Sequence, residues 1–312
     1  MDQTQTRTYI RQKFEAMGIR PQTRLGQNFL IDLNLLRLLH ESGNIGKNDV
    51  ILEVGTGTGS LTAPMADKAA AVITVEVDPV MQDLARQALF GRENIRFIKV
   101  DILKNKNRLH NEVLEVIREE LATPGEAGEE RQFKLVANLP YNVATPLISN
   151  LLLIDTPPSL MCVTIQKELA DRIIAQPCSK NWGALSLWVQ SQCNTEIVRT
   201  MPPTVFWPRP KVESAIIRLT LDEKRRKKIP DLKFYHEFYR AIFFHRRKFL
   251  RAELCSAFKH TISKERIDGI MNEMQFDTTT RAETLPLKTM QRLCELCRQE
   301  LLKLPEKERK IL

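Results

Sequence analysis

ILEVGTGTGSLT, residues 51–62, joins a short apolar run to a turn that contains Gly55, Gly57 and Gly59, and an amphipathic segment follows it. A strand, a glycine-rich turn and a helix in this order are typical of nucleotide-binding α/β sheets, because glycines let backbone N–H groups approach a ligand at the helix N-terminus. The spacing G-x-G-x-G differs from the dinucleotide pattern G-x-G-x-x-G, and no basic residue follows as it does in a phosphate-binding loop. Taken alone, the turn is also compatible with a purely structural role.

The first two thirds of the chain alternate apolar, β-branched runs with amphipathic ones. The predicted strands are 50–54, 71–77, 95–100, 133–138, 160–166, 194–200 and 213–221, and the predicted helices are about 60–69, 79–90, 111–121, 144–153, 167–175 and 183–191. This alternation predicts an α/β fold with a doubly wound, mostly parallel sheet covered on both faces. The last two strands have no long helix between them, so we expect that edge of the sheet to be antiparallel.

A charged, proline-containing segment at 222–231, DEKRRKKIPD, separates this region from a purely helical one. The helical patterns that follow it are about 234–245, 247–259, 263–274 and 286–302. We therefore predict a Rossmann-like domain with an N-terminal helical segment, a linker and a small all-α domain, at 1–222, 223–231 and 232–312. A second break at 122–131, ATPGEAGEER, is predicted to be a surface loop.

The positive charge is concentrated in the last third of the chain. Of the formal net charge of +9, residues 1–205 contribute 22 Lys and Arg against 23 Asp and Glu, whereas residues 206–312 contribute 25 against 15. A basic surface beside a near-neutral body suggests a polyanionic partner such as RNA, although solvated, lysine-rich helices also produce such an excess.

Composition argues against several other classes of protein. The hydrophobic fraction of 43% and the charged fraction of 27% are ordinary for a globular protein, and no apolar run or signal core indicates a membrane or secreted protein. We therefore expect a cytoplasmic location. The six cysteines form no disulfide or zinc pattern, and the close pair Cys294 and Cys297 lies in a helical pattern that indicates packing. No metal site is predicted.

Two carboxylates follow the next two strands of the predicted sheet. Glu76 lies near the end of the run ITVEV, and Asp101 follows the run IKV. A carboxylate at the first position can accept hydrogen bonds from both hydroxyls of a ribose, and one at the second can accept from an adenine amino group. The glycine-rich turn and two acids at successive strand ends therefore predict a cofactor that contains adenosine, either NAD or S-adenosylmethionine.

VANLPYNVATPLI, residues 136–148, ends the fourth predicted strand with an amide, a rigid turn and an aromatic ring. An NAD-dependent enzyme would need His, Lys or Tyr groups that handle a hydride transfer. The segment from Asn138 to Tyr141 offers hydrogen-bond acceptors and an aromatic face in their place. This difference favours S-adenosylmethionine.

Eight motifs occur in the order found in the rRNA adenine N6,N6-dimethyltransferases, and the chain resembles that family over roughly residues 17–300. They are LGQNFLID, LEVGTGTGSLT, VEVD, VANLPYNVATPLI, IQKELADRI, VFWPRPKVESAIIRL, HRRKFLRAEL and RAETL. The long C-terminal domain makes the chain more similar to the small-subunit enzymes linked to kasugamycin sensitivity than to the erythromycin-resistance methylases, which act on large-subunit rRNA.

This resemblance implies a class I S-adenosylmethionine-dependent methyltransferase fold. It also implies methyl transfer to N6 of two adjacent adenosines near the 3′ end of small-subunit rRNA, in a pre-30S assembly intermediate, and we expect a monomer. The family's cofactor contacts fall on Asn28, Leu30, Gly55, Glu76, Asp101 and Asn138, to which the turn adds Gly57; the resemblance alone supplies the first two. Phosphate contacts are expected from Lys211, His245, Arg246, Arg247, Lys248 and Arg251.

The predicted catalytic residues follow from the acceptor's chemistry. The exocyclic amine of adenine is a poor nucleophile, so the site must stabilise the positive charge that develops on nitrogen. We expect the Asn138 side-chain oxygen and the Leu139 carbonyl to accept the amine hydrogens, with Pro140 fixing the turn. Tyr141 is expected to stack on one face of the flipped base and Phe206, by the family's pattern, on the other; a core position is the alternative for Phe206.

The chain departs from the family's pattern at a few positions. Ala252 stands where Asn is frequent, which puts a polar contact there in doubt, and Trp207 and Arg209 replace residues that are commonly Thr or Ser and Pro. Two other functions remain open at this point, namely methylation of large-subunit rRNA and an assembly or transcription factor that has lost turnover. The intact Gly55, Glu76 and Asp101 and the NLPY motif argue against the second.

Overall fold

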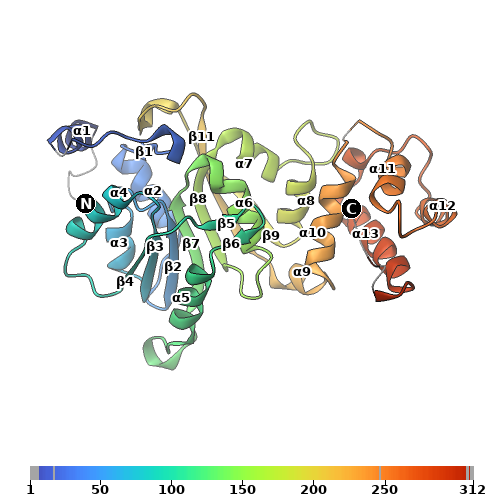
Figure 1. Ribbon diagram of the computed structural model, residues 1–312, viewed down its shortest axis with the longest axis horizontal. Coiled ribbons are helices and arrows are strands. Elements are labelled where there is room, and N and C mark those ends of the chain that lie inside the picture. Colours follow the sequence, from blue (N-terminus) through green and yellow to red (C-terminus); the bar gives the residue numbers. More distant parts are fainter. Residues whose placement is uncertain (1–6, 17, 246, 307–308, 310–312) are drawn as a thin grey trace. The chain divides into compact units, whose positions relative to one another are not determined.

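The computed structural model describes residues 7–16, 18–245, 247–306 and 309 (Figure 1). The chain divides into two compact units, the first formed by Met1–Ala170 with Thr195–Leu221 and the second by Asp171–Asn194 with Asp222–Leu312. The sequence analysis had assigned residues 171–194 to the first domain. They join the second unit because helix α8 (Ala184–Gln190) packs against helix α10 (Leu232–Ile242) of that unit.

A seven-stranded mixed sheet forms the first unit, in the order β4-β3-β2-β7-β8-β11-β9. The strands are β2 (Asp49–Val54), β3 (Ala71–Val75), β4 (Ile95–Ile98), β7 (Gln132–Asn138), β8 (Leu160–Gln166), β9 (Cys193–Met201) and β11 (Ser214–Leu221). Strands β4, β3, β2, β7 and β8 run parallel to one another, whereas β11 is antiparallel to β8. The predicted doubly wound sheet with an antiparallel edge is confirmed.

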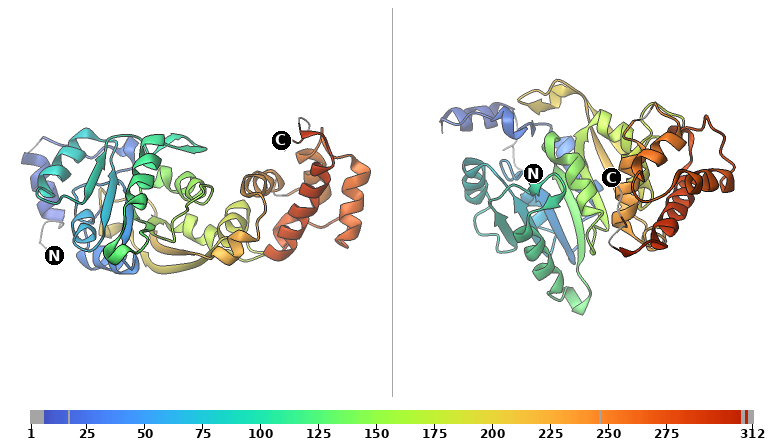
Figure 2. Two further views of the ribbon diagram at one scale, coloured as in Figure 1. Left: turned by 90° about the horizontal axis from the view of Figure 1, so that it is seen from below. Right: turned by 45° about the vertical axis from the view of Figure 1, so that its right-hand side comes forward.

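Helices cover both faces of this sheet, as Figure 2 shows. Helices α2 (Leu33–Ser42), α3 (Thr62–Ala66) and α4 (Pro79–Ala88) contribute side chains to one core, together with strand residues such as Ile51 and Val136. Because side chains alternate along a strand, neighbours such as Leu52 face the other side, where α5 (Asn111–Ala122) and α6 (Tyr141–Leu151) pack. Strand β2 is buried along its whole length, as expected for a strand covered on both faces.

The N-terminal segment was only partly predicted. It contains helix α1 (Arg7–Ala16), a 3₁₀ turn at Thr23–Leu25 and the two-residue strand β1 (Phe29–Leu30), which pairs antiparallel with β10 (Phe206–Trp207). Ile10 and Phe14 of α1 pack with Phe29 and Met81 in a small separate core. The sequence analysis predicted a helical N-terminal segment but gave no bounds for α2, whose first turn is capped by the Asp32 side chain.

Two segments that surround α5 are irregular. A short hairpin of β5 (Leu103–Asn105) and β6 (Arg108–Leu109) precedes the helix, and a loop with a 3₁₀ turn at Glu126–Gly128 follows it. The hairpin packs against α6. The predicted surface loop at 122–131 is confirmed in its position, since most of its residues are exposed.

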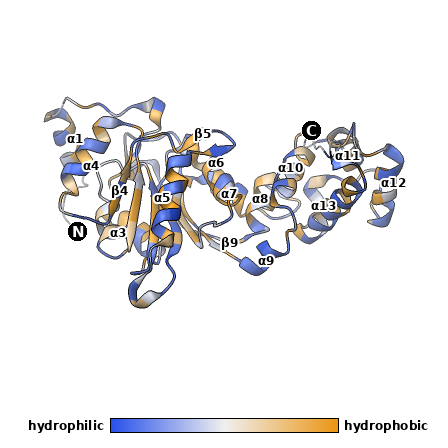
Figure 3. Ribbon diagram, turned by 60° about the horizontal axis from the view of Figure 1, so that its bottom comes forward, coloured by the Kyte–Doolittle hydropathy of each residue, from blue (hydrophilic) through white to orange (hydrophobic). Residues whose placement is uncertain are grey.

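The second unit is helical, as predicted, apart from the first residues of β9. It contains the end of α7 (Lys167–Ile173), α8, α9 (Glu223–Lys227), α10, α11 (Leu250–Ala257), α12 (Lys264–Glu273), a 3₁₀ turn at Ala282–Thr284 and α13 (Leu287–Leu302). The hydrophilic helix α9 occupies the predicted linker (Figure 3). Cys294 and Cys297 are both buried in α13, which agrees with their predicted packing role. Within the described residues, no helix is both long and apolar enough to cross a bilayer.

Candidate active site

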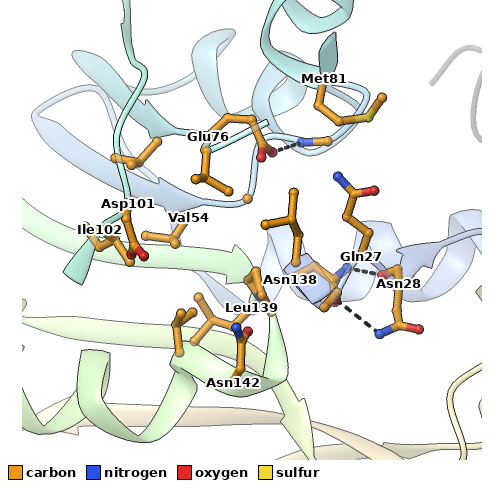
Figure 4. A pocket seen from close by; sticks show the side chains of 18 of the residues that line it. Gln27, Asn28, Val54, Glu76, Met81, Asp101, Ile102, Asn138, Leu139 and Asn142 are labelled. Carbon is orange, nitrogen blue, oxygen red and sulfur yellow. Dashed lines mark hydrogen bonds between the residues drawn. The ribbon is translucent and has the colours of Figure 1, made fainter. Parts of the chain in front are cut away.

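A pocket opens at the carboxyl ends of the parallel strands, where sheets of this kind bind their ligands (Figure 4). It contains about 800 Å³ of empty space, including its open mouth. Its walls come from the ends of β2, β3 and β7, from the segment after β4, and from the N-terminal segment before β1. The predicted site residues that line it are Asn28, Gly55, Gly57, Glu76, Asp101, Asn138, Leu139 and Pro140.

Two of the three left-handed glycines in the turn after β2 line the pocket. Gly55 and Gly57 have φ angles of 86° and 55°, in the left-handed region that favours glycine. A Cβ atom on Gly55 would lie 3.3 Å from Pro140 Cδ, and one on Gly57 would lie 3.2 Å from Phe29 Cε1. The pocket therefore has a wall of bare backbone that a ligand can approach closely.

Glu76 is held at the end of β3 by backbone donors. Its carboxylate accepts hydrogen bonds from the Gly57 N–H at 3.2 Å and from the Asp78 N–H at 3.0 Å. Burial raises the pKa of Glu76 above its ordinary value, and the two N–H groups oppose that shift. Each carboxylate oxygen keeps a lone pair for a further donor, so the group can accept hydrogen bonds from a pair of vicinal hydroxyls.

Asp101 and several apolar side chains line the neighbouring wall. Asp101 is exposed, and its Oδ1 accepts a hydrogen bond from the Leu103 N–H at 2.9 Å, which leaves Oδ2 for a ligand. Val54 and Ile102 lie beside it and Met81 lies farther along the pocket, beyond Glu76, and all three offer apolar surface suited to a planar ring (Figure 4). This wall can hold an adenine ring and accept a hydrogen bond from its amino group.

Asn138 lies on the opposite side of the pocket, at the last position of β7. Its Nδ2 donates to the Asn28 carbonyl at 2.9 Å, so Oδ1 is left to accept a hydrogen bond. The next residue, Leu139, has a buried side chain and is fixed by a hydrogen bond from its N–H to the Thr164 carbonyl at 3.2 Å. Pro140 then begins the turn into α6. The backbone that presents these acceptors is held by hydrogen bonds on both sides.

The structure places the remaining predicted site residues of the first unit outside the pocket. Tyr141 begins α6, and its hydroxyl hydrogen-bonds to Ser214 Oγ at 2.6 Å; burial raises its pKa. Phe206 is 2% exposed and lies in the main core, because its pairing with Leu30 turns the ring inward. The predicted stacking role of Phe206 is therefore wrong for this arrangement, and the alternative of a core aromatic holds. Leu30 is also buried, and it lines only a smaller hollow beside the same turn, together with Gly55, Gly57 and Asn138.

Sequence reasoning missed the residues that fasten the N-terminal segment to the pocket. Gln22 Nε2 and Gln27 Nε2 both donate to Asp78 Oδ2, at 3.0 and 2.8 Å. Gln27 also lines the pocket, as does Met81. The motifs LGQNFLID and VEVD contain Gln27 and Asp78, but spacing along the chain does not show that these two motifs touch.

The residues predicted to contact phosphate differ in whether their side chains are exposed or held in an ion pair. Lys211, Arg247 and Lys248 are exposed, as is His245, and Arg246 lies outside the described residues. Arg251 is instead engaged by Asp268 in two hydrogen bonds of 2.5 and 2.8 Å. That pairing raises the pKa of Arg251 and lowers the pKa of Asp268.

The sheet order and the pocket at its strand ends define a Rossmann-like methyltransferase. The chain belongs to the ribosomal RNA adenine dimethylase family, whose model matches residues 19–291. It is 37% identical to the ribosomal RNA small subunit methyltransferase A of Listeria innocua over 86% of this chain and 88% of that protein. It is 36% identical to the protein of the same name from Clostridium acetobutylicum over 91% of this chain and 96% of that protein.

Solved structures with the same fold are less similar in sequence. A dimethyladenosine transferase from Plasmodium falciparum superposes with a TM-score of 0.68 at 21% identity, covering 86% of this chain and 97% of that one. The 23S rRNA methyltransferase ErmE superposes with a TM-score of 0.58, also at 21% identity, covering 87% and 100%. Both establish the fold.

Membership of this family makes the protein an rRNA-modifying methyltransferase and implies a methyl donor of the S-adenosylmethionine type. The pocket fits such a donor. It combines a glycine wall without room for a Cβ, a buried carboxylate with lone pairs free for vicinal hydroxyls, and apolar surface beside Asp101.

Proposed function

We propose that this protein transfers methyl groups from S-adenosyl-L-methionine to N6 of two adjacent adenosines near the 3′ end of small-subunit (16S) rRNA, giving N6,N6-dimethyladenosine. Its relatives carry the name of small-subunit methyltransferases. The observation that carries the chemistry is the placement of Asn138 Oδ1 across one pocket from Glu76 and Asp101 (Figure 4). We further propose that the protein acts as a monomer in the cytoplasm, on a pre-30S assembly intermediate.

In this proposal the strand ends hold the donor. S-adenosyl-L-methionine supplies an electrophilic methyl group when it is bound. Glu76 would accept from the two ribose hydroxyls, and Asp101 would accept from the adenine amino group. The backbone at Gly55 and Gly57, the Asn28 segment and the backbone of Leu30 would enclose the rest of the molecule.

Asn138 and Leu139 would act on the acceptor amine. As the N6 lone pair forms a bond to the methyl carbon, the methyl–sulfur bond breaks and its electron pair leaves with the neutral thioether S-adenosyl-L-homocysteine, so that nitrogen becomes tetrahedral and positively charged. The Asn138 Oδ1 and the Leu139 carbonyl oxygen would accept the two amine hydrogens and stabilise that charge, and Pro140 fixes the angle of the turn that carries them. The methylated nitrogen then loses a proton to water, so no strong general base is required.

The target base must leave its stack before it can reach this pocket. Tyr141 is the aromatic residue beside the acceptor groups, and we propose that its ring packs on the flipped adenine. Its hydroxyl is anchored by Ser214, which would limit the movement of the ring. Phe206 has no part in this step because its ring is buried in the core.

Methyl transfer with a tritiated donor tests this proposal. Immature small subunits and large-subunit rRNA are offered separately, and primer-extension stops map the modified positions. We expect incorporation into two adjacent adenosines near the 3′ end of small-subunit rRNA only. Incorporation confined to large-subunit rRNA, or no incorporation into either substrate, would contradict it.

A further inference from the structure

The second unit contains a hollow that no part of the proposed mechanism uses. It lies beside helices α8 and α10 and contains about 770 Å³ of empty space, including its open mouth. The interior space comparable with known ligand cavities is about 350 Å³, near the lower end of the roughly 300–1,000 Å³ of pockets that hold small organic ligands. Its walls are Arg172, the segment 181–186, Arg240, Phe243 and Phe244, all of which belong to the second unit.

Two cations of this hollow are available to a ligand. Arg172 and Arg240 are both exposed, and neither has an ion-pair partner among the residues that the structure describes. Other arginines of the same unit are paired, among them Arg251 with Asp268 and Arg298 with Glu295. Burial and, secondarily, the positive charge of Arg240 lower the pKa of the neighbouring His236 to about 4.

An aromatic ring stands at the edge of the same hollow without a partner that would bury it. Phe244 is 78% exposed, and its only ring contact within the described part of the chain is an edge-on one with His245, at 4.7 Å between centroids. Phe243 lines the hollow beside it and is half-buried. An exposed ring next to unpaired guanidinium groups is the combination with which proteins bind unstacked nucleotides, by stacking on the base and ion pairing with its phosphate.

We infer that this hollow is a binding site for a single unpaired nucleotide of RNA, with Phe244 stacked on the base and Arg172 and Arg240 on the adjoining phosphates. The inference rests on the proposed function, in that it takes rRNA as the ligand. RNA is favoured over an acidic protein segment because the last third of the chain carries a net excess of ten positive charges and the hollow presents an aromatic face. The site binds a nucleotide other than the reacting adenosine and has no catalytic role.

Two substitutions on exposed side chains test the site, each with a matched control. Phe244→Ala is compared with Phe90→Ala, which removes a 91% exposed ring from the first unit. Arg240→Gln is compared with Lys233→Gln, which removes an exposed cation from the same helix α10. Binding of the full-length proteins to transcribed small-subunit rRNA is measured over a range of salt concentrations, together with binding of S-adenosyl-L-methionine as a check of folding.

We expect Phe244→Ala to weaken RNA binding roughly 5- to 100-fold and Phe244→Tyr to restore it, because stacking needs an aromatic face. Arg240→Gln should weaken binding and reduce the slope of log K against log salt by about 0.7, the value for one phosphate contact on a single strand. Both controls should bind RNA within about twofold of the unsubstituted protein, since neither residue lines the hollow.

The inference is overturned if Phe244→Ala and Arg240→Gln bind RNA as tightly as their controls do. It is also overturned if these variants keep their RNA affinity and lose affinity for an acidic peptide. Restoration by Phe244→Leu as well as by Phe244→Tyr would also overturn it, because a merely apolar contact would then suffice. Failure of the proposed function has a different signature, since the unsubstituted protein would then transfer no methyl group to small-subunit rRNA whatever the variants bind.

Discussion

The strand-end pocket of the first unit and the basic surface of the second unit hold their functional groups in opposite ways. In the pocket, Glu76 and Asn138 are fixed by hydrogen bonds to backbone groups from distant parts of the chain. On the basic surface, Arg240 and Phe244 are exposed, and no described residue holds their side chains by such hydrogen bonds. We infer that precise positioning serves the methyl transfer itself, whereas adaptable charged and aromatic groups serve the binding of a large, variable RNA surface. The predictions below test that division.

The largest effect on methyl transfer is expected from substitution of Asn138. Its Oδ1 would accept a hydrogen bond from the amine, whereas its Nδ2 anchors the Asn28 segment, and different substitutions can separate these two functions. Asn138→Ala removes the oxygen that would face the amine and should lower kcat roughly 10²- to 10³-fold, the usual effect of deleting one electrostatic contact to a transition state. Asn138→Asp keeps an acceptor oxygen but loses the N–H group that donates a hydrogen bond to the Asn28 carbonyl. This variant should therefore retain more activity than Asn138→Ala but bind S-adenosyl-L-methionine less tightly than the unsubstituted protein. Single-turnover methyl transfer and donor binding are measured separately.

Retention of full activity by Asn138→Ala would contradict the mechanism. RNA binding by the same variant provides the control, since it should equal that of the unsubstituted protein. A parallel loss of RNA binding would mean that the pocket and the basic surface are not functionally separate.

A smaller loss is expected at Glu76. Glu76→Gln keeps the shape of the side chain but removes its charge and one acceptor, and hydrogen bonds to a charged group contribute about 1.5–3 kcal/mol. We therefore expect the KM for S-adenosyl-L-methionine to rise roughly 10- to 100-fold, with little change in RNA affinity. Isothermal titration with the donor gives the direct measurement. An unchanged donor affinity would show that Glu76 is a structural residue of the turn.

The same contrast explains what the sequence could reveal. The parallel strands were predictable because buried strands have distinctive apolar runs, and their carboxyl ends necessarily meet at one edge of the sheet. Gly55, Glu76, Asp101 and Asn138 could therefore be assigned to one pocket from the order of the strands alone. The places of these four residues in the pocket follow from the path of the backbone.

Long-range contacts between short segments were not predictable. Strands β1 and β10 have two residues each, too few to show any periodicity, yet their pairing decides that Phe206 points into the core. Likewise, no sequence pattern shows that Gln22 and Gln27 meet Asp78, or that Arg251 is engaged by Asp268 whereas Arg240 has no ion-pair partner in the described part of the chain. Charged side chains can be counted from sequence, but their partners cannot.

A moderate effect on stability is expected from Glu53, which lies behind the glycine turn. It is 1% exposed, accepts hydrogen bonds from Thr62 Oγ1 and Thr74 Oγ1 at 2.6 Å each, and burial raises its pKa to about 8. Between pH 4.5 and about 8 the folded protein holds a proton that the unfolded chain releases. The free energy of unfolding should therefore fall as pH rises through this interval, by up to about 1.4 kcal/mol per pH unit.

Glu53→Gln tests this dependence because the amide is neutral at every pH. Urea unfolding, followed by circular dichroism from pH 5 to pH 8, should give a flatter dependence for the variant. Some slope should remain, since burial also raises the pKa of Glu76 in the same direction. Identical slopes for the two proteins would show that Glu53 is ionised in the fold.

The smallest effect, on RNA affinity, is expected from substitution of Arg251, although this residue lies in the same basic motif as Arg247. Because Asp268 holds the Arg251 guanidinium in two hydrogen bonds, Arg251→Gln should change RNA affinity by less than about twofold. Arg247→Gln removes an exposed cation and should reduce the salt slope by about 0.7–0.9. NMR titration gives an independent readout, since Arg251→Gln should let the lowered pKa of Asp268 rise to its ordinary range. If Arg251→Gln instead weakens RNA binding as much as Arg247→Gln does, the ion pair opens when RNA binds, and paired arginines of the second unit also belong to the binding surface.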